Sequence, residues 1–509
     1  MELKTVRQPL SVNEAVFNGG GEIPVDEDII LPDYYAQINK LLKCRMEGRI
    51  TSKSINGKSV TVDGHICINI MYCDKNCKIH NYEHISPVSR SFDASCDLSG
   101  ALIETCLKTE YNNCRVVTER KVSVHGALSL TLTAFLQKKY EVIADIGDKD
   151  IQIDRIDMPA LNTLGNAEKN LLIEEVLTLS QGQPDIEGIL RYCADTTVNE
   201  VKAVRNKVSV KGSISLNVLY KAKDNCAVYK SAIPFSQLID IGGISEDCVC
   251  TAKVQLCYLE VTPAKGADSV RSMNFNAKLA VTAHSYCDDI IPVITDAYST
   301  DCNLQLNKTD LSVLKIVGHI SDTFMFKQTV DFDSDGIAGI IDSWSETEVS
   351  SCSFSGNELT ANLKINLCIL AQCTDGNVSY FEKRIDTVYK KQTEYDVKGS
   401  LLSECDFEPV SVSYTLISDS SIDYRIEYRV NISLSEENKV KLLTEIGRGE
   451  SLSKDKNKDC SLIIYYAGVG ERIWDIAKRY NSDVEQIREI NSIKCDVLED
   501  DKQLLIPLF

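Results

Sequence analysis

The residues that could perform chemistry are scattered along this 509-residue chain. Its six histidines stand at positions 65, 80, 84, 125, 284 and 319. Only His80 and His84 are four residues apart. The segment 80–84 is not the His-Glu-x-x-His motif of a zincin, and it lies in no strong helical pattern. Acyl or metal catalysis needs such groups to converge. We therefore expect no catalytic residues and no metal site.

Cofactor and nucleophile motifs give the same expectation. The chain has no Gly-x-x-x-x-Gly-Lys-Ser/Thr phosphate loop and no Gly-x-Ser-x-Gly nucleophile elbow. The glycine run 19–21 is interpreted as a loop hinge. Asp33 and Asp185 could be paired acids, but each follows a proline at what we take to be a repeated position, which favours turn or cap roles. We expect no cofactor and no enzymatic activity.

Composition limits the partners and the compartment. A net charge of -19 and a pI of about 4.9 argue against nucleic acid and anionic membranes, which attract basic surfaces. The longest apolar stretches are too short to span a bilayer, and no signal peptide opens the chain. We therefore expect a cytosolic protein whose twenty cysteines are reduced by default. Their fate in later oxidative cross-linking is left open.

An alternating pattern recurs along the chain. Residues 60–72 are VTVDGHICINIMY and residues 208–220 are VSVKGSISLNVLY, so that Val, Val, Gly, Ile and Tyr recur at identical spacing. A weaker third copy spans 359–369. An apolar residue at every second position predicts half-buried antiparallel strands.

The surroundings of these segments repeat as well. Further alternating strands start near 122, 273 and 424, in the same order relative to the first series. We predict a mainly β fold of three antiparallel β-sandwich or barrel-like modules. Their expected bounds are 1–165, 166–304 and 305–447, the third module being the most diverged.

The C-terminal segment follows another pattern. Residues 448–460 are polar and charged, which predicts a flexible linker. In 461–509 a strand at 462–466 and a strand at 504–507 enclose two stretches with helical spacing, 473–480 and 484–490. We expect Ser482 to be the N-cap of the second helix, with Glu485 completing a capping box. This order predicts a small α/β domain of βααβ type.

This segment resembles a LysM domain. The carrying residues are Tyr466, Gly470, Glu471, 473–477, Tyr480, Val484, Ile487, Asn491 and 504–507. LysM domains generally bind N-acetylglucosamine polymers, and the resemblance implies a groove between 470–473 and 491–494. The chain departs from the family at Gly470-Glu471-Arg472, where Gly-Asp-Thr is usual, and at Asp500-Asp501-Lys502, where Pro-Gly-Gln is usual. These departures favour protein binding by the same fold.

The resemblance and the strand pattern together predict the partner-binding residues of this domain. Since adjacent residues of a strand point to opposite faces, one of Ile463 and Ile464 should face outward. Trp474 is interpreted first as a core residue and second as a contact residue. The complete predicted set is Ile463, Ile464, Tyr466, Gly470, Glu471, Arg472, Ile473, Trp474, Asn491, Ser492 and Ile493.

The repeated phrases resemble the SPOCS modules of clostridial spore proteins. Three such modules before a LysM domain are similar to a family of spore-coat morphogenesis proteins. The resemblance implies a non-catalytic adaptor in the mother-cell cytoplasm, at the forespore surface and spore coat. It also implies binding of the coat-basement ATPase SpoIVA through the LysM domain, with other coat proteins as candidate partners of the β modules.

Two alternatives stay open. The chain could be a peptidoglycan-binding protein of the spore cortex or wall, or a wall enzyme that uses LysM as an anchor. The missing catalytic motifs count against the enzyme.

Overall fold

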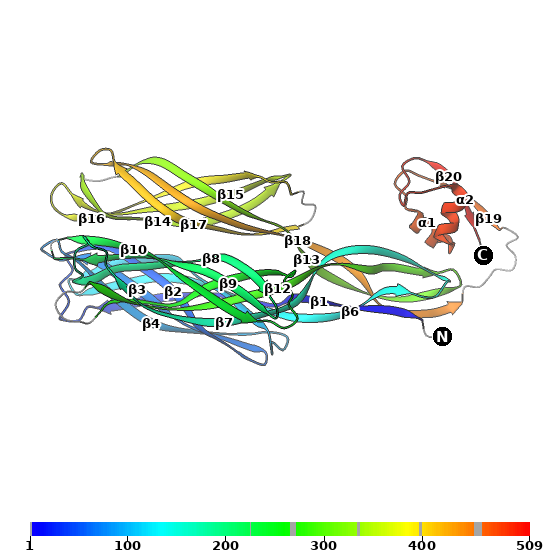
Figure 1. Cartoon of the computed structure of the whole chain (residues 1–509), viewed down its shortest axis with the longest axis horizontal. Helices are drawn as coiled ribbons and strands as arrows, with labels where there is room; N and C mark the ends of the chain where they lie inside the picture. The colour runs from blue at the N-terminus through cyan, green and yellow to red at the C-terminus, as the bar shows by residue number, and fades with distance from the viewer. Residues whose placement is uncertain are drawn as a thin grey trace.

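The chain folds into three elongated β modules and a small C-terminal α/β domain (Figure 1). The computed structural model describes residues 3–223, 225–264, 271–332, 336–395, 400–451 and 461–508, without the side chains of 159–162, 288–289, 312–317, 400–404 and 437–438. All strand pairs in these ranges are antiparallel. The predicted fold class, mainly β with a βααβ domain at the C-terminus, is confirmed.

Module 1 is a sandwich of two three-stranded sheets, ordered β1-β6-β5 and β2-β3-β4. Its strands are β1 (Thr5–Ile30), β2 (Lys40–Asn56), β3 (Ser59–Cys73), β4 (Ile79–Asp93), β5 (Leu102–Thr118) and β6 (Lys121–Ile146). The alternating apolar residues of the central strands β3 and β6 point into one core between the sheets. The two segments that the sequence pattern singled out are therefore the central strands of the two sheets.

Modules 2 and 3 repeat this arrangement, with sheets β7-β12-β11 and β8-β9-β10, then β13-β18-β17 and β14-β15-β16. Module 2 consists of β7 (Ile151–Thr178), β8 (Gly188–Val204), β9 (Lys207–Lys221), β10 (Cys226–Asp240), β11 (Val249–Pro263) and β12 (Ser272–Ser299). Module 3 consists of β13 (Cys302–Asp331), β14 (Ile337–Ser355), β15 (Glu358–Cys373), β16 (Val378–Gln392), β17 (Ser400–Leu416) and β18 (Ser421–Ser451). Each module has its own apolar core between its two sheets.

Two tyrosines anchor equivalent loops in modules 1 and 2. Tyr72 donates its hydroxyl hydrogen to the carbonyl of Ala36 at 2.9 Å, and Tyr220 donates to that of Pro184 at 3.1 Å. The equivalent of Pro184 is therefore Ala36. Asp33 and Asp185 consequently do not occupy equivalent positions, and our interpretation of them as repeat-equivalent was wrong.

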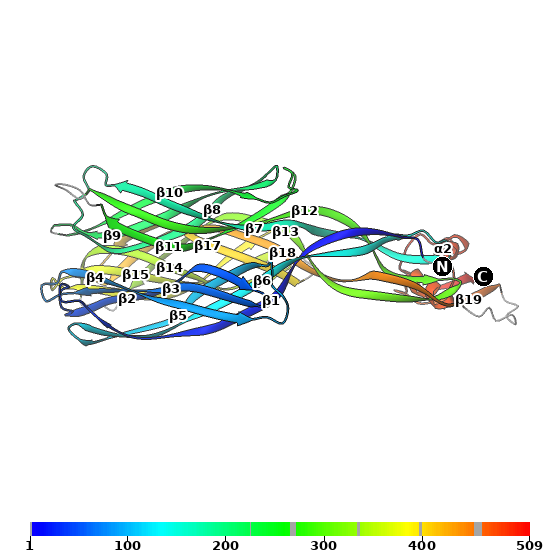
Figure 2. The same cartoon turned by 90° about the horizontal axis from the view of Figure 1, so that it is seen from below.

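The first and last strands of each module form a shared stalk. These strands have 26 to 31 residues, and their outer halves run beyond the sandwiches as three paired ribbons (Figures 1 and 2). Each ribbon has a bulge between its inner and outer halves, which adds local twist. The stalk core combines all three modules: Leu10, Val12, Val142, Met158, Ile291, Val293, Leu311 and Leu442.

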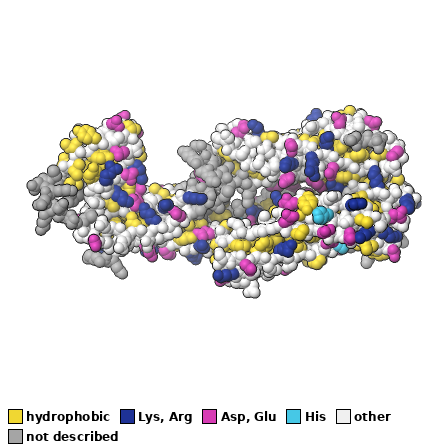
Figure 3. Space-filling model, turned by 180° about the vertical axis from the view of Figure 1, so that it is seen from behind, with side chains coloured by type: hydrophobic (Ala, Val, Ile, Leu, Met, Phe, Trp, Pro, Cys, Tyr) yellow, Lys and Arg dark blue, Asp and Glu magenta, His cyan; other side chains and the backbone are white. Residues whose placement is uncertain are grey.

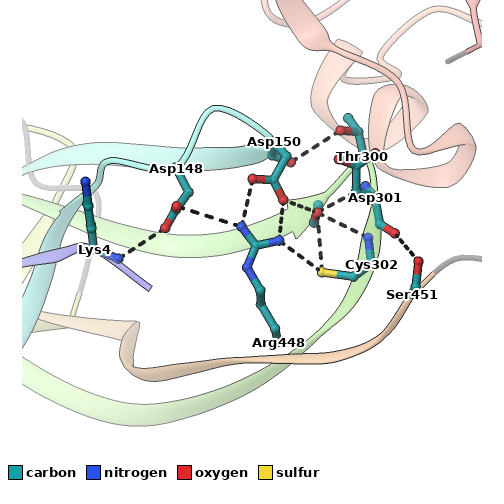
Figure 4. A network of polar contacts seen from close by, with 9 residues as sticks. Lys4, Asp148, Asp150, Thr300, Asp301, Cys302, Arg448 and Ser451 are labelled. Atoms are coloured by element: carbon teal, nitrogen blue, oxygen red, sulfur yellow. Dashed lines mark hydrogen bonds and ion pairs between the residues drawn. The ribbon is translucent and has the colours of Figure 1, made fainter. Parts of the chain in front are cut away.

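A polar network joins the modules at the far end of the stalk (Figure 4). Arg448 of β18 donates from both terminal nitrogens to Asp150, with N–O distances of 2.7 and 2.8 Å, and lies 3.8 Å from Asp148. Asp150 also accepts a hydrogen bond from Ser299 at 2.9 Å. Hydrogen bonds from Arg448, the largest influence, hold the pKa of Asp150 below its ordinary value. The network connects module 3 to the β6–β7 connection and to the end of β12.

The strand bounds differ from the sequence expectations at four places. Position 165, the expected first boundary, lies inside β7, and 305 lies inside β13, because the outer halves of these strands belong to the stalk. Residues 448–451 of the expected linker pair with β13, while 452–460 lie outside the described residues. The glycine run 19–21 pairs with β6 inside β1 and is not a loop hinge.

The three sandwiches also contact one another beside the stalk. Side chains of all three modules line a cavity of about 810 Å³. At its edge Arg191 of β8 donates to the Asp342 carboxylate of β14 at 2.7 Å, and both side chains are buried. The Arg191 guanidinium also lies 4.0 Å from the ring centre of Trp344. The modules therefore form one packed body rather than separate beads.

Candidate functional site

The C-terminal domain packs two helices against a two-stranded sheet. It consists of β19 (Leu462–Ala467), α1 (Ile473–Tyr480), α2 (Val484–Asn491) and β20 (Lys502–Pro507). The apolar residues at helical spacing, Ile473, Ile476, Ala477 and Ile487, fill its core. This order and spacing are those that the sequence pattern predicted.

The start of α2 differs in detail from the prediction. Asp483 is the N-cap, and its side chain accepts the backbone N–H of Gln486 at 3.0 Å. Ser482 is instead buried, and its hydroxyl donates to the carbonyl of Pro507. The prediction of Ser482 as N-cap was wrong because its hydroxyl is used to bind β20.

Strand β19 presents three apolar side chains to solvent. Leu462, Ile464 and Tyr466 are 42%, 55% and 77% exposed, whereas Ile463 and Tyr465 between them pack against the domain core. Figure 3 shows exposed hydrophobic side chains gathered on this domain. Because Leu505 of β20 pairs with Ile464, it shares that side of the sheet. We call Leu462, Ile464, Tyr466 and Leu505 the outer face.

Helix α1 lies against the stalk. Trp474 meets the ring of Tyr298 from β12 edge to face, with centroids 5.0 Å apart. Tyr298 is buried and belongs to the apolar core of the C-terminal domain, although it comes from module 2. Its hydroxyl donates to the carbonyl of Ser482 at 2.6 Å. The aromatic pair and this hydrogen bond fix the helix on the ribbon of module 2.

Two polar pairs border this contact. Arg472, the N-cap of α1, donates to the Asp154 carboxylate at 3.1 and 3.2 Å. Gln152 donates to Asp483 at 3.0 Å. Both partners on the stalk belong to β7, which is the strand paired with the end of β12.

Asp296 pairs with lysines from two different elements. Its carboxylate pairs with Lys478 of α1 and with Lys308 of β13, the latter at 2.9 Å, and accepts a longer bond of 3.4 Å from the Trp474 indole. Partial burial raises the pKa of Asp296, but hydrogen bonds and charges from the two lysines together outweigh it and hold the pKa below its ordinary value. The carboxylate therefore stays ionised and attracts both lysines.

The first loop that the LysM resemblance places beside a sugar groove, 470–473, is bonded to residues 496–498, which follow the second expected segment, 491–494. Gly470 donates its backbone N–H to Leu498, Leu498 donates to Glu471, and Ile473 donates to Asp496, at 2.8 to 3.0 Å. These backbone groups are thus satisfied within the domain. A ligand in such a groove would have to bind other groups.

The residues that depart from the LysM pattern have structural roles here. Asp501 accepts the backbone N–H of Val469 at 3.0 Å and so fixes the first loop from the second. Glu471 accepts from the Gly468 N–H and from the Tyr465 hydroxyl, both at 2.9 Å. Asp501 thus joins the two loops, and Glu471 holds the first loop against the end of β19.

The predicted partner-binding residues fall into three groups. Those that face solvent are Ile464, Tyr466, Gly470 and Ser492. Those held against the stalk are Arg472 and Trp474. Those used inside the domain are Ile463, Glu471, Ile473, Asn491 and Ile493.

Sequence reasoning missed residues of both the outer face and the stalk contact. Leu462 and Leu505 could have been found by continuing the alternation of their strands. Tyr298 and Asp296 could not have been found, because nothing in the sequence of β12 or of α1 signals a contact between residues so far apart in the chain.

Elsewhere, the histidines do not converge. His80 lies 3.0 Å from Asp74, His84 2.9 Å from Glu27, and His284 3.0 Å from Glu104, at three separate places. Within the described ranges, no group of three or more His, Cys, Asp and Glu side chains could hold a metal ion. The same ranges contain no helix with the length and apolarity to cross a bilayer.

Family models match three segments of the chain. The model described as SipL, SPOCS domain, matches residues 37–117 and 185–263, and the LysM domain model matches 469–507. The chain therefore contains two segments similar to the SipL SPOCS domain and a C-terminal segment similar to LysM domains. No curated protein and no solved structure matches it.

The SipL match follows the fold of the modules. It covers β2 to β5 of module 1 and β8 to β11 of module 2, and leaves out the long stalk strands β1, β6, β7 and β12. Module 3 lies outside the match but has the same six-strand order. SPOCS and LysM are non-catalytic domain families. The two matches support a spore-coat-related protein with a domain of the peptidoglycan-binding type.

Proposed function

We propose that this SipL-type chain is a non-catalytic adaptor in spore-coat assembly. In this proposal it works in the mother-cell cytoplasm at the forespore surface, and its LysM domain binds the coat-basement ATPase SpoIVA. The observation that carries the proposal is the apolar outer face, on which Leu462, Ile464 and Tyr466 are all exposed. The partner's name comes from the family resemblance, and the kind of surface comes from the structure.

The chemistry of the outer face suits a protein better than a glycan. Exposed aliphatic and aromatic side chains on a small sheet bury well against another apolar surface and supply the anchors of protein interfaces. Sugars need polar groups for orientation, and the loop N–H groups of Gly470, Ile473 and Leu498 already have partners.

The β modules suit the role of a carrier. Their apolar cores and the contacts among them make one packed body, from whose stalk the LysM domain presents its outer face. A packed body holds a binding domain in a defined position, which reduces the ordering cost of association. Other coat proteins are candidate partners of this body.

The test uses the full chain with two ligands in parallel: purified SpoIVA, and insoluble peptidoglycan. The proposal predicts retention by SpoIVA and none by peptidoglycan. Retention by peptidoglycan alone would contradict it.

A second candidate function has one specific observation in its favour. The LysM family model matches residues 469–507 almost to the end of the domain, and that family binds N-acetylglucosamine polymers. A peptidoglycan-binding role in the spore cortex or wall is the alternative, and the same two-ligand experiment separates it from the adaptor.

A further inference from the structure

The stalk contact of the LysM domain has the make-up of a binding site. On the side of module 2 stand two carboxylates, Asp154 and Asp296, with the ring of Tyr298 beside them. On the side of the LysM domain stand Arg472, Lys478 and the ring of Trp474. Arg472 pairs with Asp154 and Lys478 pairs with Asp296. The rings of Trp474 and Tyr298 pack against each other.

Tyr298 shows how closely the two parts fit. Its side chain is 5% exposed and Trp474 is 8% exposed, and the two rings pack against each other within one apolar cluster. Burial raises the pKa of the Tyr298 phenol, whose hydrogen stays available to the Ser482 carbonyl. Because Tyr298 comes from module 2, the LysM domain by itself lacks one residue of its own apolar cluster.

The connection between the parts is short. Residues 452–460 join β18 to the LysM domain, and nine residues span at most about 30 Å when fully extended. A domain on so short a tether stays at a high effective concentration near its site. Even a contact of modest intrinsic affinity is then mostly formed.

We infer that the end of the module 2 ribbon, formed by Gln152, Asp154, Asp296 and Tyr298, is a docking site for the chain's own LysM domain. This site holds helix α1 and directs the outer face to solvent. A partner that needs Trp474 or Arg472 has to displace the ribbon, whereas a partner of the outer face does not. The inference does not depend on which partner the outer face binds.

The test follows the environment of Trp474 in the full chain. The chain has two tryptophans, so Trp344→Phe leaves Trp474 as the sole indole. In this background we expect Asp296→Lys and Tyr298→Ala to increase acrylamide quenching of Trp474 severalfold. Both changes lie in module 2, and the LysM sequence stays intact.

Asp310→Lys is the matched control, because Asp310 is an exposed carboxylate on the neighbouring stalk strand β13. It should leave the quenching unchanged. Adding Lys478→Asp to Asp296→Lys restores opposite charges across the contact and should restore protection of Trp474. This rescue distinguishes lost docking from general unfolding of either part.

Two results would overturn the inference. One is a Trp474 that is quenched as strongly in the parent chain as in the Asp296→Lys and Tyr298→Ala variants. The other is equal loss of protection in Asp296→Lys and in the Asp310→Lys control.

Discussion

Gly64 and Gly212 recur at equivalent positions because the backbone of the neighbouring strand leaves no room for a side chain there. A Cβ atom on Gly64 would lie 2.3 Å from the carbonyl oxygen of Arg49, and one on Gly212 would lie 2.2 Å from that of Thr197. Each glycine sits beside a β-bulge in the neighbouring strand. The sequence pattern located both glycines, but the bulge is a property of a second strand and could not be derived from the first.

Gly64→Ala should destabilise module 1. The added methyl group has to displace a backbone carbonyl, and overpacking of this kind costs about 1–3 kcal/mol. Denaturant unfolding of the full chain measures the loss. Gly21→Ala is the control, since a Cβ at Gly21 meets nothing within 4 Å. Equal stability of the two variants would contradict the close approach of Gly64 to the Arg49 carbonyl oxygen.

Arg448→Gln should loosen the end of the stalk. It removes the two-point contact with Asp150, and hydrogen bonds to charged groups contribute about 1.5–3 kcal/mol each before solvent screening. Because both groups are partly exposed, we expect a total loss of about 1–2 kcal/mol in the free energy of unfolding at neutral pH. Denaturant unfolding of the two proteins at pH 7 measures it.

The same pair predicts a pH dependence. The pKa of Asp150 is lowered in the folded chain from 3.8, so the contribution of the pair is complete above that value and is lost as pH falls through the lowered pKa. The stability difference between the parent chain and Arg448→Gln should therefore shrink as the pH falls below about 3.8. A difference that stays constant from pH 7 to pH 3 would contradict the assignment of this ion pair.

At the scale of elements, the sequence revealed the central strands far better than the edge strands. Strands β3 and β9 each have a partner on both sides and alternate over most of their length, so their period of two was visible. The edge strand β4 has mostly half-buried and exposed residues, and its pattern carries little signal. The alternation of β19 did predict that one of Ile463 and Ile464 faces outward, and the exposed residue is Ile464.

The tyrosines that end β3 and β9 should stabilise the loops before β2 and β8. Tyr72→Phe and Tyr220→Phe each remove one buried hydrogen bond to a backbone carbonyl, which should lower the free energy of unfolding by about 1 kcal/mol. Tyr34→Phe, at a side chain 85% exposed, should change nothing. Thermal unfolding of the three variants measures this, and an effect at Tyr34 equal to the others would refute the anchoring role.

At the scale of the whole molecule, the number of modules and their β character followed from the repeats, but the stalk did not. Its core brings together Leu10, Met158 and Leu442, which lie in three different modules. Local periodicity cannot report packing between residues so far apart, and the expected boundary at 165 therefore lies inside the long strand β7. The docking of the LysM domain on module 2 was hidden for the same reason.

The most direct test of the adaptor account is the dissociation constant of the full chain with SpoIVA, measured for the parent, Ile464→Asp and Leu172→Asp. Leu172 is also an exposed aliphatic residue of a strand, but it lies on module 2. A carboxylate at an interface anchor costs about 2 kcal/mol or more, so Ile464→Asp should bind about 30-fold more weakly while Leu172→Asp binds like the parent. Unchanged binding by Ile464→Asp, with its LysM domain folded, would contradict the claim that the outer face is the partner-binding surface.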